Sequence, residues 1–102
     1  MYEEFVNYGV MPSDECVELV IEDSIGVSSI IFSRYRGTQE KILGNGLFIR
    51  DTLFTDSKGN ETVNQTCMTY SAVKYLIEET DMPDVVKENL NENLERLLTD
   101  AS

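Results

Sequence analysis

Residues 47–56, LFIRDTLFTD, and residues 61–71, ETVNQTCMTYS, are separated by the short polar segment 57–60, SKGN. Both flanking segments are rich in threonine, β-branched and aromatic residues, and apolar positions alternate with polar ones along them. Two such runs joined by a tight polar turn predict an antiparallel β-hairpin. This hairpin is the clearest structural signal in the chain.

After the hairpin the apolar period changes from that of a strand to that of a helix. Ala72, Val73, Leu76 and Ile77 recur at helical spacing. The segment 81–83, Asp-Met-Pro, is expected to end this helix and start another, because proline is well tolerated in a first turn. The second helix carries one apolar stripe, made of Val86, Leu90, Leu94, Leu97 and Leu98.

Before the hairpin, residues 27–36, VSSIIFSRYR, read as a further strand. The segment 39–43, QEKIL, precedes Gly-Asn-Gly and fits either a helical turn or the arm of a hairpin.

Residues 13–23, SDECVELVIED, fit two structures. As a strand, the segment alternates apolar and acidic side chains and is rich in β-branched residues. As a helix, it has Ser13 as the N-cap after Pro12 and acidic residues at the positive end of the helix dipole. We favour the helix, and the strand stays open as the alternative.

These patterns predict a single α+β domain over residues 1–102. We expect a small antiparallel sheet of three to four strands, covered on one face by two C-terminal helices, with a short N-terminal helix at residues 13–23. A chain of 102 residues with 41% hydrophobic residues is long enough to bury one modest core.

The net charge is −11, from 19 acidic and 8 basic residues, and it is segregated along the chain. Residues 1–33 carry −7 and no basic residue, residues 34–74 carry +2, and residues 75–102 carry −6. Such a field repels nucleic acid and anionic membranes and attracts cationic partners. We therefore expect no direct binding to nucleic acid and no membrane association.

Several classes of enzyme and metal site are excluded by composition. The chain has no histidine, so it lacks Ser-His and Cys-His nucleophile pairs and every metal site that needs imidazole. Cys16 and Cys67 stand 51 positions apart, which matches no zinc spacing. A calcium loop beginning at Asp56 fails because Lys58 takes a ligand position and Glu61 replaces the turn glycine. We expect a non-enzymatic protein without cofactor or metal.

The N-terminal residues 1–12 are acidic and lack the apolar run of a signal peptide, and no later run has the length of a membrane span. The expected location is the cytoplasm, where Cys16 and Cys67 would be reduced thiols buried as small hydrophobic side chains.

A row of acidic residues lies opposite the leucine stripe of the last helix. Its members step by three or four positions and so share one helix face. They are Asp81, Asp84, Glu88, Glu92 and Glu95. A helical segment 13–23 would align Glu15, Glu18 and Glu22 in a second, smaller row. Exposed helix faces are usually polar, so either row taken alone indicates no more than a solvated surface.

In size, charge and absence of catalytic residues, the chain resembles the small acidic proteins that phages and mobile elements use against restriction or CRISPR nucleases. It also resembles the immunity proteins that cap basic nucleases. The resemblance implies an inhibitor that docks in the positively charged nucleic-acid groove of a partner. The alternative is an assembly module that forms a homodimer or joins a complex. Arg34, Arg36 and Lys41 form a competing basic group, for which internal pairing is the default interpretation.

Overall fold

The computed structural model describes residues 6–35 and 47–99 of the chain. Within these ranges, strands come first and helices last. The elements are β1 (Asn7–Pro12), β2 (Cys16–Glu22), β3 (Gly26–Tyr35), β4 (Leu47–Asp56), β5 (Glu61–Thr69), α2 (Tyr70–Glu79) and α3 (Asp84–Thr99). The segment 39–43, for which two structures were expected, lies outside the described residues.

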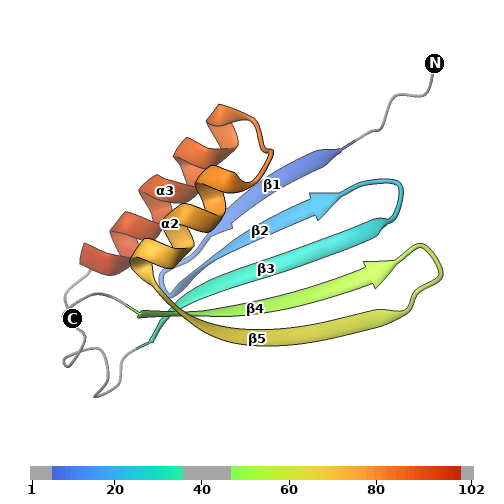
Figure 1. The fold of residues 1–102 in the computed structure, drawn as a ribbon, viewed down its shortest axis with the longest axis horizontal. Coiled ribbons are helices and arrows are strands. Elements are labelled where there is room, and N and C mark those ends of the chain that lie inside the picture. The colour runs from blue at the N-terminus through green and yellow to red at the C-terminus, as the bar shows by residue number, and fades with distance from the viewer. Residues whose placement is uncertain (1–5, 36–46, 100–102) are drawn as a thin grey trace.

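The strands form one sheet in the order β1-β2-β3-β4-β5, and each strand is antiparallel to its neighbours (Figure 1). The prediction of an α+β fold with an antiparallel sheet is confirmed, and the hairpin of β4 and β5 lies where the sequence indicates. The predicted strand number is wrong, because the sheet has five strands and not three or four. The additional strands are β1 and β2, which pair as an N-terminal hairpin.

The helix predicted at residues 13–23 is also wrong. Ser13 begins the turn into β2, where its Oγ accepts a hydrogen bond from the Cys16 N–H at 3.2 Å. Val17 and Leu19 are buried at 0% and 3% exposure, whereas the residue between them, Glu18, is half-buried on the other face. Both periodicities were present in this segment, and pairing with β1 and β3 selects the strand because it buries alternate residues.

Both C-terminal helices are confirmed, and together they form one layer on one face of the sheet (Figure 1). Thr69 is the N-cap of α2, and its side chain accepts a hydrogen bond from the Ala72 N–H. The C-cap of α2 is Thr80, whose N–H bonds the carbonyls of Leu76 and Ile77. The carbonyl of Pro83 accepts hydrogen bonds from Val86 and Lys87, so α3 begins directly after the proline as expected, whereas α2 has already ended at Glu79.

The core lies between the helical layer and the sheet. Helix α3 packs over β1, β2 and β3, and α2 packs over β4 and β5. The largest fully buried side chains are Phe32, Phe48, Leu90, Leu94, Val17 and Val73. The leucine stripe predicted for the last helix is thus the surface that α3 presents to the sheet.

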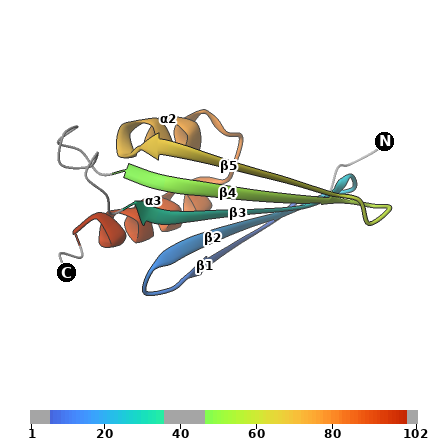
Figure 2. The same ribbon diagram turned by 90° about the horizontal axis from the view of Figure 1, so that it is seen from below.

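The helices cover only part of the long sheet (Figures 1 and 2). The covered end holds the turn between β1 and β2 and the start of β4. The far end holds the turns at residues 23–26 and 57–60, which project beyond the helices. The sheet face that points away from the helices is called the bare face below, because none of the described elements packs on it.

Candidate protein-binding surface

The acidic row of the last helix points away from the sheet. Asp84, Glu88, Glu92 and Glu95 are exposed on the side of α3 opposite the buried Leu90, Leu94 and Leu97, and Asp81 is exposed in the preceding loop. With a rise of about 1.5 Å per residue, successive carboxylates stand about 4.5 to 6 Å apart along the axis. The structure therefore brings four of the five predicted residues onto one exposed ridge of α3, and the fifth, Asp81, is exposed in the loop before it.

The two basic residues of α3 are directed toward backbone carbonyls. Lys87 Nζ donates a hydrogen bond to the carbonyl of Glu78 at 3.1 Å, which ties α3 to α2. Arg96 Nη2 donates to the carbonyl of Ser13 at 2.6 Å, which ties α3 to the turn between β1 and β2. Both cations thus contribute to holding the helical layer in place.

Two large apolar side chains are exposed on the same outer surface of the helical layer. Tyr75 of α2 is 68% exposed and Val85 of α3 is 71% exposed. Tyr75 stands three residues before Glu78, and Val85 stands three residues before Glu88, so each apolar side chain neighbours an exposed carboxylate on its helix. This surface combines apolar anchor positions with negative charge.

One member of the ridge has a specific partner within the chain. Tyr70 Oη donates a hydrogen bond to Glu95 Oε1 at 3.4 Å. Burial, followed by the negative charge of Glu95, raises the pKa of Tyr70 above its ordinary value. Glu95 therefore contributes to the packing of α2 against α3 as well as to the ridge.

The second predicted acidic row does not exist as a row. Glu15 lies exposed in the turn between β1 and β2, and Glu18 and Glu22 point to the bare face of β2. Glu18 is half-buried and accepts a hydrogen bond from Ser29 Oγ. Glu18 and Glu22 lie across the sheet from the α3 ridge, and Glu15 lies apart from them in the turn, so these three residues form no second acidic row.

The competing basic group is represented by Arg34, because Arg36 and Lys41 lie outside the described residues. Arg34 faces the helical layer, where Nη1 donates hydrogen bonds to the carbonyls of Leu97 and Leu98 in the last turn of α3. A guanidinium at this position complements the negative end of the helix dipole. Arg34 therefore has an internal role.

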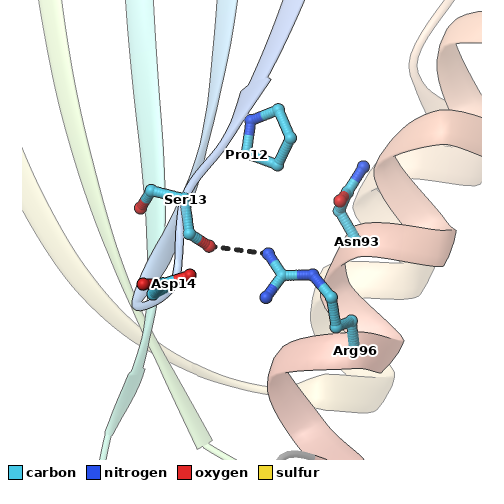
Figure 3. Close-up of a pocket in the computed structure, with 5 residues that line it drawn as sticks. All are labelled: Pro12, Ser13, Asp14, Asn93 and Arg96. Atoms are coloured by element: carbon cyan, nitrogen blue, oxygen red, sulfur yellow. Dashed lines mark hydrogen bonds between the residues drawn. The ribbon is translucent and has the colours of Figure 1, made fainter.

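A shallow depression, unforeseen from the sequence, lies where the turn between β1 and β2 meets α3. It has a volume of about 330 Å³ and is lined by Pro12, Ser13, Asp14, Asn93 and Arg96 (Figure 3). The bond from Arg96 to the Ser13 carbonyl crosses it. The lining residues are some 80 positions apart in the chain, and no local pattern indicates that they meet.

The bare face of the sheet was also missed, although its signal is visible in the sequence of β3. Ile30 and Ile31 are adjacent, so one of them must point away from the helices. Exposed apolar residues on the bare face include Met11, Leu53 and Val63, at 51%, 37% and 73% exposure. A sheet covered on both faces would have buried them.

The two cysteines also lie on the bare face, and they are free thiols. Both were expected to be buried, but Cys16 is half-buried and Cys67 is exposed, so the prediction is wrong for Cys67 and is met only in part for Cys16. Two strands separate β2 from β5, which places the two residues about 14 Å apart at a strand spacing of about 4.8 Å. A disulfide within the chain is excluded at that distance.

No protein-family model, no curated protein and no solved structure matches the chain. Among residues 6–35 and 47–99, no three histidine, cysteine, aspartate or glutamate side chains are grouped so as to hold a metal ion. Neither of the helices in these ranges is long and apolar enough to span a membrane.

Proposed function

We propose that this protein is a non-enzymatic inhibitor whose helical layer docks in the positively charged nucleic-acid groove of a nuclease. The proposal assigns it to the acidic anti-defence proteins of phages and mobile elements, which block restriction or CRISPR nucleases. Its partner is a basic protein, and it binds neither nucleic acid nor membrane.

The observation that carries the proposal is the composition of the outer surface of the helical layer. Asp84, Glu88 and Glu92 are exposed along α3, while Lys87 and Arg96 are engaged with backbone carbonyls. The field of this surface is therefore negative, and it favours approach to a cationic groove.

The exposed apolar residues give the same surface a means of forming a lasting contact. Charge complementarity mainly raises association rates, whereas tight binding depends on a few desolvated anchors, among which tyrosine is frequent. Tyr75 and Val85 stand among the carboxylates and can fill that role. Carboxylates spaced about 4.5 to 6 Å apart resemble the phosphates of one DNA strand in sign and linearity, though they are sparser.

The test is a competition assay with purified enzymes. An RNA-guided nuclease and several type II restriction enzymes are each incubated with a fluorescent DNA duplex and increasing amounts of the protein. DNA release and cleavage are measured at low and high salt. We expect inhibition that weakens as salt rises, and a loss of about a hundredfold in potency for D84K/E88K/E92K.

The matched control is E15K/E22K/E61K, which makes the same change in net charge at three exposed residues, none of which lies on a helix. This control is expected to retain most of the inhibition. Equal potency and salt dependence of D84K/E88K/E92K and the wild type would contradict the docking surface. Failure to inhibit any enzyme of the panel would contradict the proposed class of partner.

A further inference from the structure

The two edges of the sheet differ in how they are protected. Strand β1, at one edge, is six residues long, ends at Pro12 and lies under α3. Strand β5, at the other edge, is nine residues long, contains no proline and pairs with β4 alone in the described sheet. Its pairing with β4 runs from Glu61 to Thr69 without a bulge. Open edges of this kind are usually blunted by lysine, proline or a bulge, and β5 has none of these.

Apart from Glu61, its first residue, the edge strand is also uncharged within a strongly acidic protein. No charged residue occurs between Glu61 and Lys74, although 26% of the chain is charged. All five residues of β5 before Thr66 are exposed, as is Cys67 after it, and Val63 is 73% exposed. Two copies of a protein with a net charge of −11 repel each other least when they make contact through this strand in both copies.

The sequence of β5 is suited to pairing with itself. Around Gln65 it reads Thr62, Val63 and Asn64 on one side and Thr66, Cys67 and Met68 on the other. Antiparallel pairing about Gln65 sets Val63 opposite Cys67 of the second copy and Asn64 opposite Thr66 of the second copy. Glu61 then faces Thr69 of the second copy, so no like charges are opposed.

This alignment also extends the rows of apolar side chains that run across neighbouring strands on the bare face. Leu53 pairs with Val63, and Ile49 pairs with Cys67, across β4 and β5. In the paired sheet, Leu53 and Val63 of one copy would join Cys67 and Ile49 of the other in one apolar row. The two-fold axis generates this row twice, and each row covers an exposed Val63.

The helices permit the antiparallel arrangement. Helix α2 follows directly on β5 at the covered end, and neither of the described helices lies at the far end of β5 (Figure 1). A two-fold axis through Gln65 places each α2 beside the far end of the other copy's sheet. It also keeps the helices of both copies on one face of the joined sheet, whereas parallel pairing of the two β5 edges would place them on opposite faces.

We propose that β5 pairs antiparallel with β5 of a second copy, forming a homodimer with one continuous ten-stranded sheet. The occupant is a second copy and not a cationic strand, because the neutral edge offers such a strand no attraction. The proposal is independent of the nuclease-inhibitor function, which depends on the helical layer. Its salt dependence is opposite, since screening the repulsion between two acidic copies strengthens the dimer.

The experiment is sedimentation velocity of the full chain from about 1 to about 200 µM, at about 50 and about 500 mM NaCl. We expect a concentration-dependent dimer that is tighter at high salt. In V63K/C67K, lysines face each other twice across the axis, and dimerisation weakens by about tenfold or more. In V63E/C67K, opposite charges face each other, and dimerisation is restored.

Met11→Lys is the matched control, since it adds one charge to the bare face at the other edge and should leave the dimer unchanged. Circular dichroism checks that each variant is folded. If V63K/C67K does not fold, the proposal is tested by hydrogen exchange of the wild type, measured at the lowest and at the highest protein concentration. Protection of β5 amides must then increase with concentration. A monomer at the highest concentration and salt, or a dimer of folded V63K/C67K as tight as the wild type, would overturn the proposal.

Discussion

The covered end and the far end of the sheet are stabilised in different ways. At the covered end, Phe32, Phe48 and Leu94 are fully buried between sheet and helices. At the far end, the two turns are held mainly by hydrogen bonds. Asp56 Oδ1 accepts from the N–H groups of Lys58 and Asn60, both at 2.9 Å, and Asp23 Oδ1 accepts from Ile25 at 2.9 Å.

The far-end turns also support each other. The N–H of Ser57 donates to the carbonyl of Ile25 at 3.0 Å, which links the turn at residues 57–60 to the turn at 23–26. Gly59 adopts a φ of +87°, which glycine tolerates best, and so closes its turn. The comparison shows that strands of ten residues can extend past their core when carboxylates satisfy the N–H groups of the turns. We expect mutations to cost more free energy at the covered end.

The largest effect is expected for Leu94→Ala at the covered end. Leu94 has 0% exposure, and its truncation leaves a cavity, so the free energy of unfolding should fall by about 3 kcal/mol. Leu53→Ala is the control outside the core and should cost about 1 kcal/mol or less, because Leu53 is 37% exposed. Urea denaturation followed by circular dichroism measures both. Equal losses would contradict the comparison.

An intermediate effect is expected for Gly26→Ala at the far end. A Cβ at Gly26 would lie 2.2 Å from the Thr55 carbonyl oxygen, so β3 and β4 would have to separate locally. We expect a loss of about 1 to 3 kcal/mol in the free energy of unfolding. Gly9→Ala is the control, because a Cβ there meets no atom within 4 Å. If both variants had the same free energy of unfolding as the wild type, β3 and β4 could accept a side chain at residue 26 without cost, and this prediction would be wrong.

A smaller, pH-dependent effect is expected for Asp56→Asn. Hydrogen bonds from the backbone N–H of Asn60, and next from its side-chain amide, hold the pKa of Asp56 below its ordinary value of 3.8. The ionised carboxylate therefore stabilises the fold above the unfolded-state pKa, and this contribution is lost as pH falls through the folded-state pKa.

The urea midpoints of the wild type and Asp56→Asn should consequently differ at about pH 7 and converge at about pH 2.5. Leu94→Ala provides the reference, since its deficit involves no titrating group and should persist at both pH values. A difference between wild type and Asp56→Asn that does not change with pH would show that the carboxylate charge has no part in the turn.

The smallest effect is expected for Val63→Thr on the bare face near the far end. At 73% exposure, Val63 has little apolar area to lose, and threonine keeps the β-branched shape. The free energy of unfolding, measured at about 1 µM to keep the protein monomeric, should change by about 0.5 kcal/mol or less. Val73→Thr places the same change in the core and should cost more, which sets the scale.

The elements with one strong periodicity were predictable from sequence. Apolar and polar residues alternate along the hairpin of β4 and β5. Helix α3 buries Leu90, Leu94 and Leu97, which belong to its predicted apolar stripe. The segment 13–23 was not predictable, because its residues fit a helix and a strand equally and only pairing with β1 and β3 selects one. The ridge residues of α3 followed from helical spacing, whereas the alignment of Glu15, Glu18 and Glu22 failed together with the helix that it required.

By itself, the sequence determined the α+β class, the order of the C-terminal hairpin and helices, and the segregation of charge, because these depend on local periodicity and composition. The tertiary structure alone decided the five-strand sheet, the opposite sides taken by the acidic residues of β2 and α3, and the engagement of Arg34 and Arg96 with distant carbonyls. It also decided that β5 is the open, neutral edge. Each of these depends on contacts between segments far apart in the chain, where burial and hydrogen bonding choose among locally equivalent conformations.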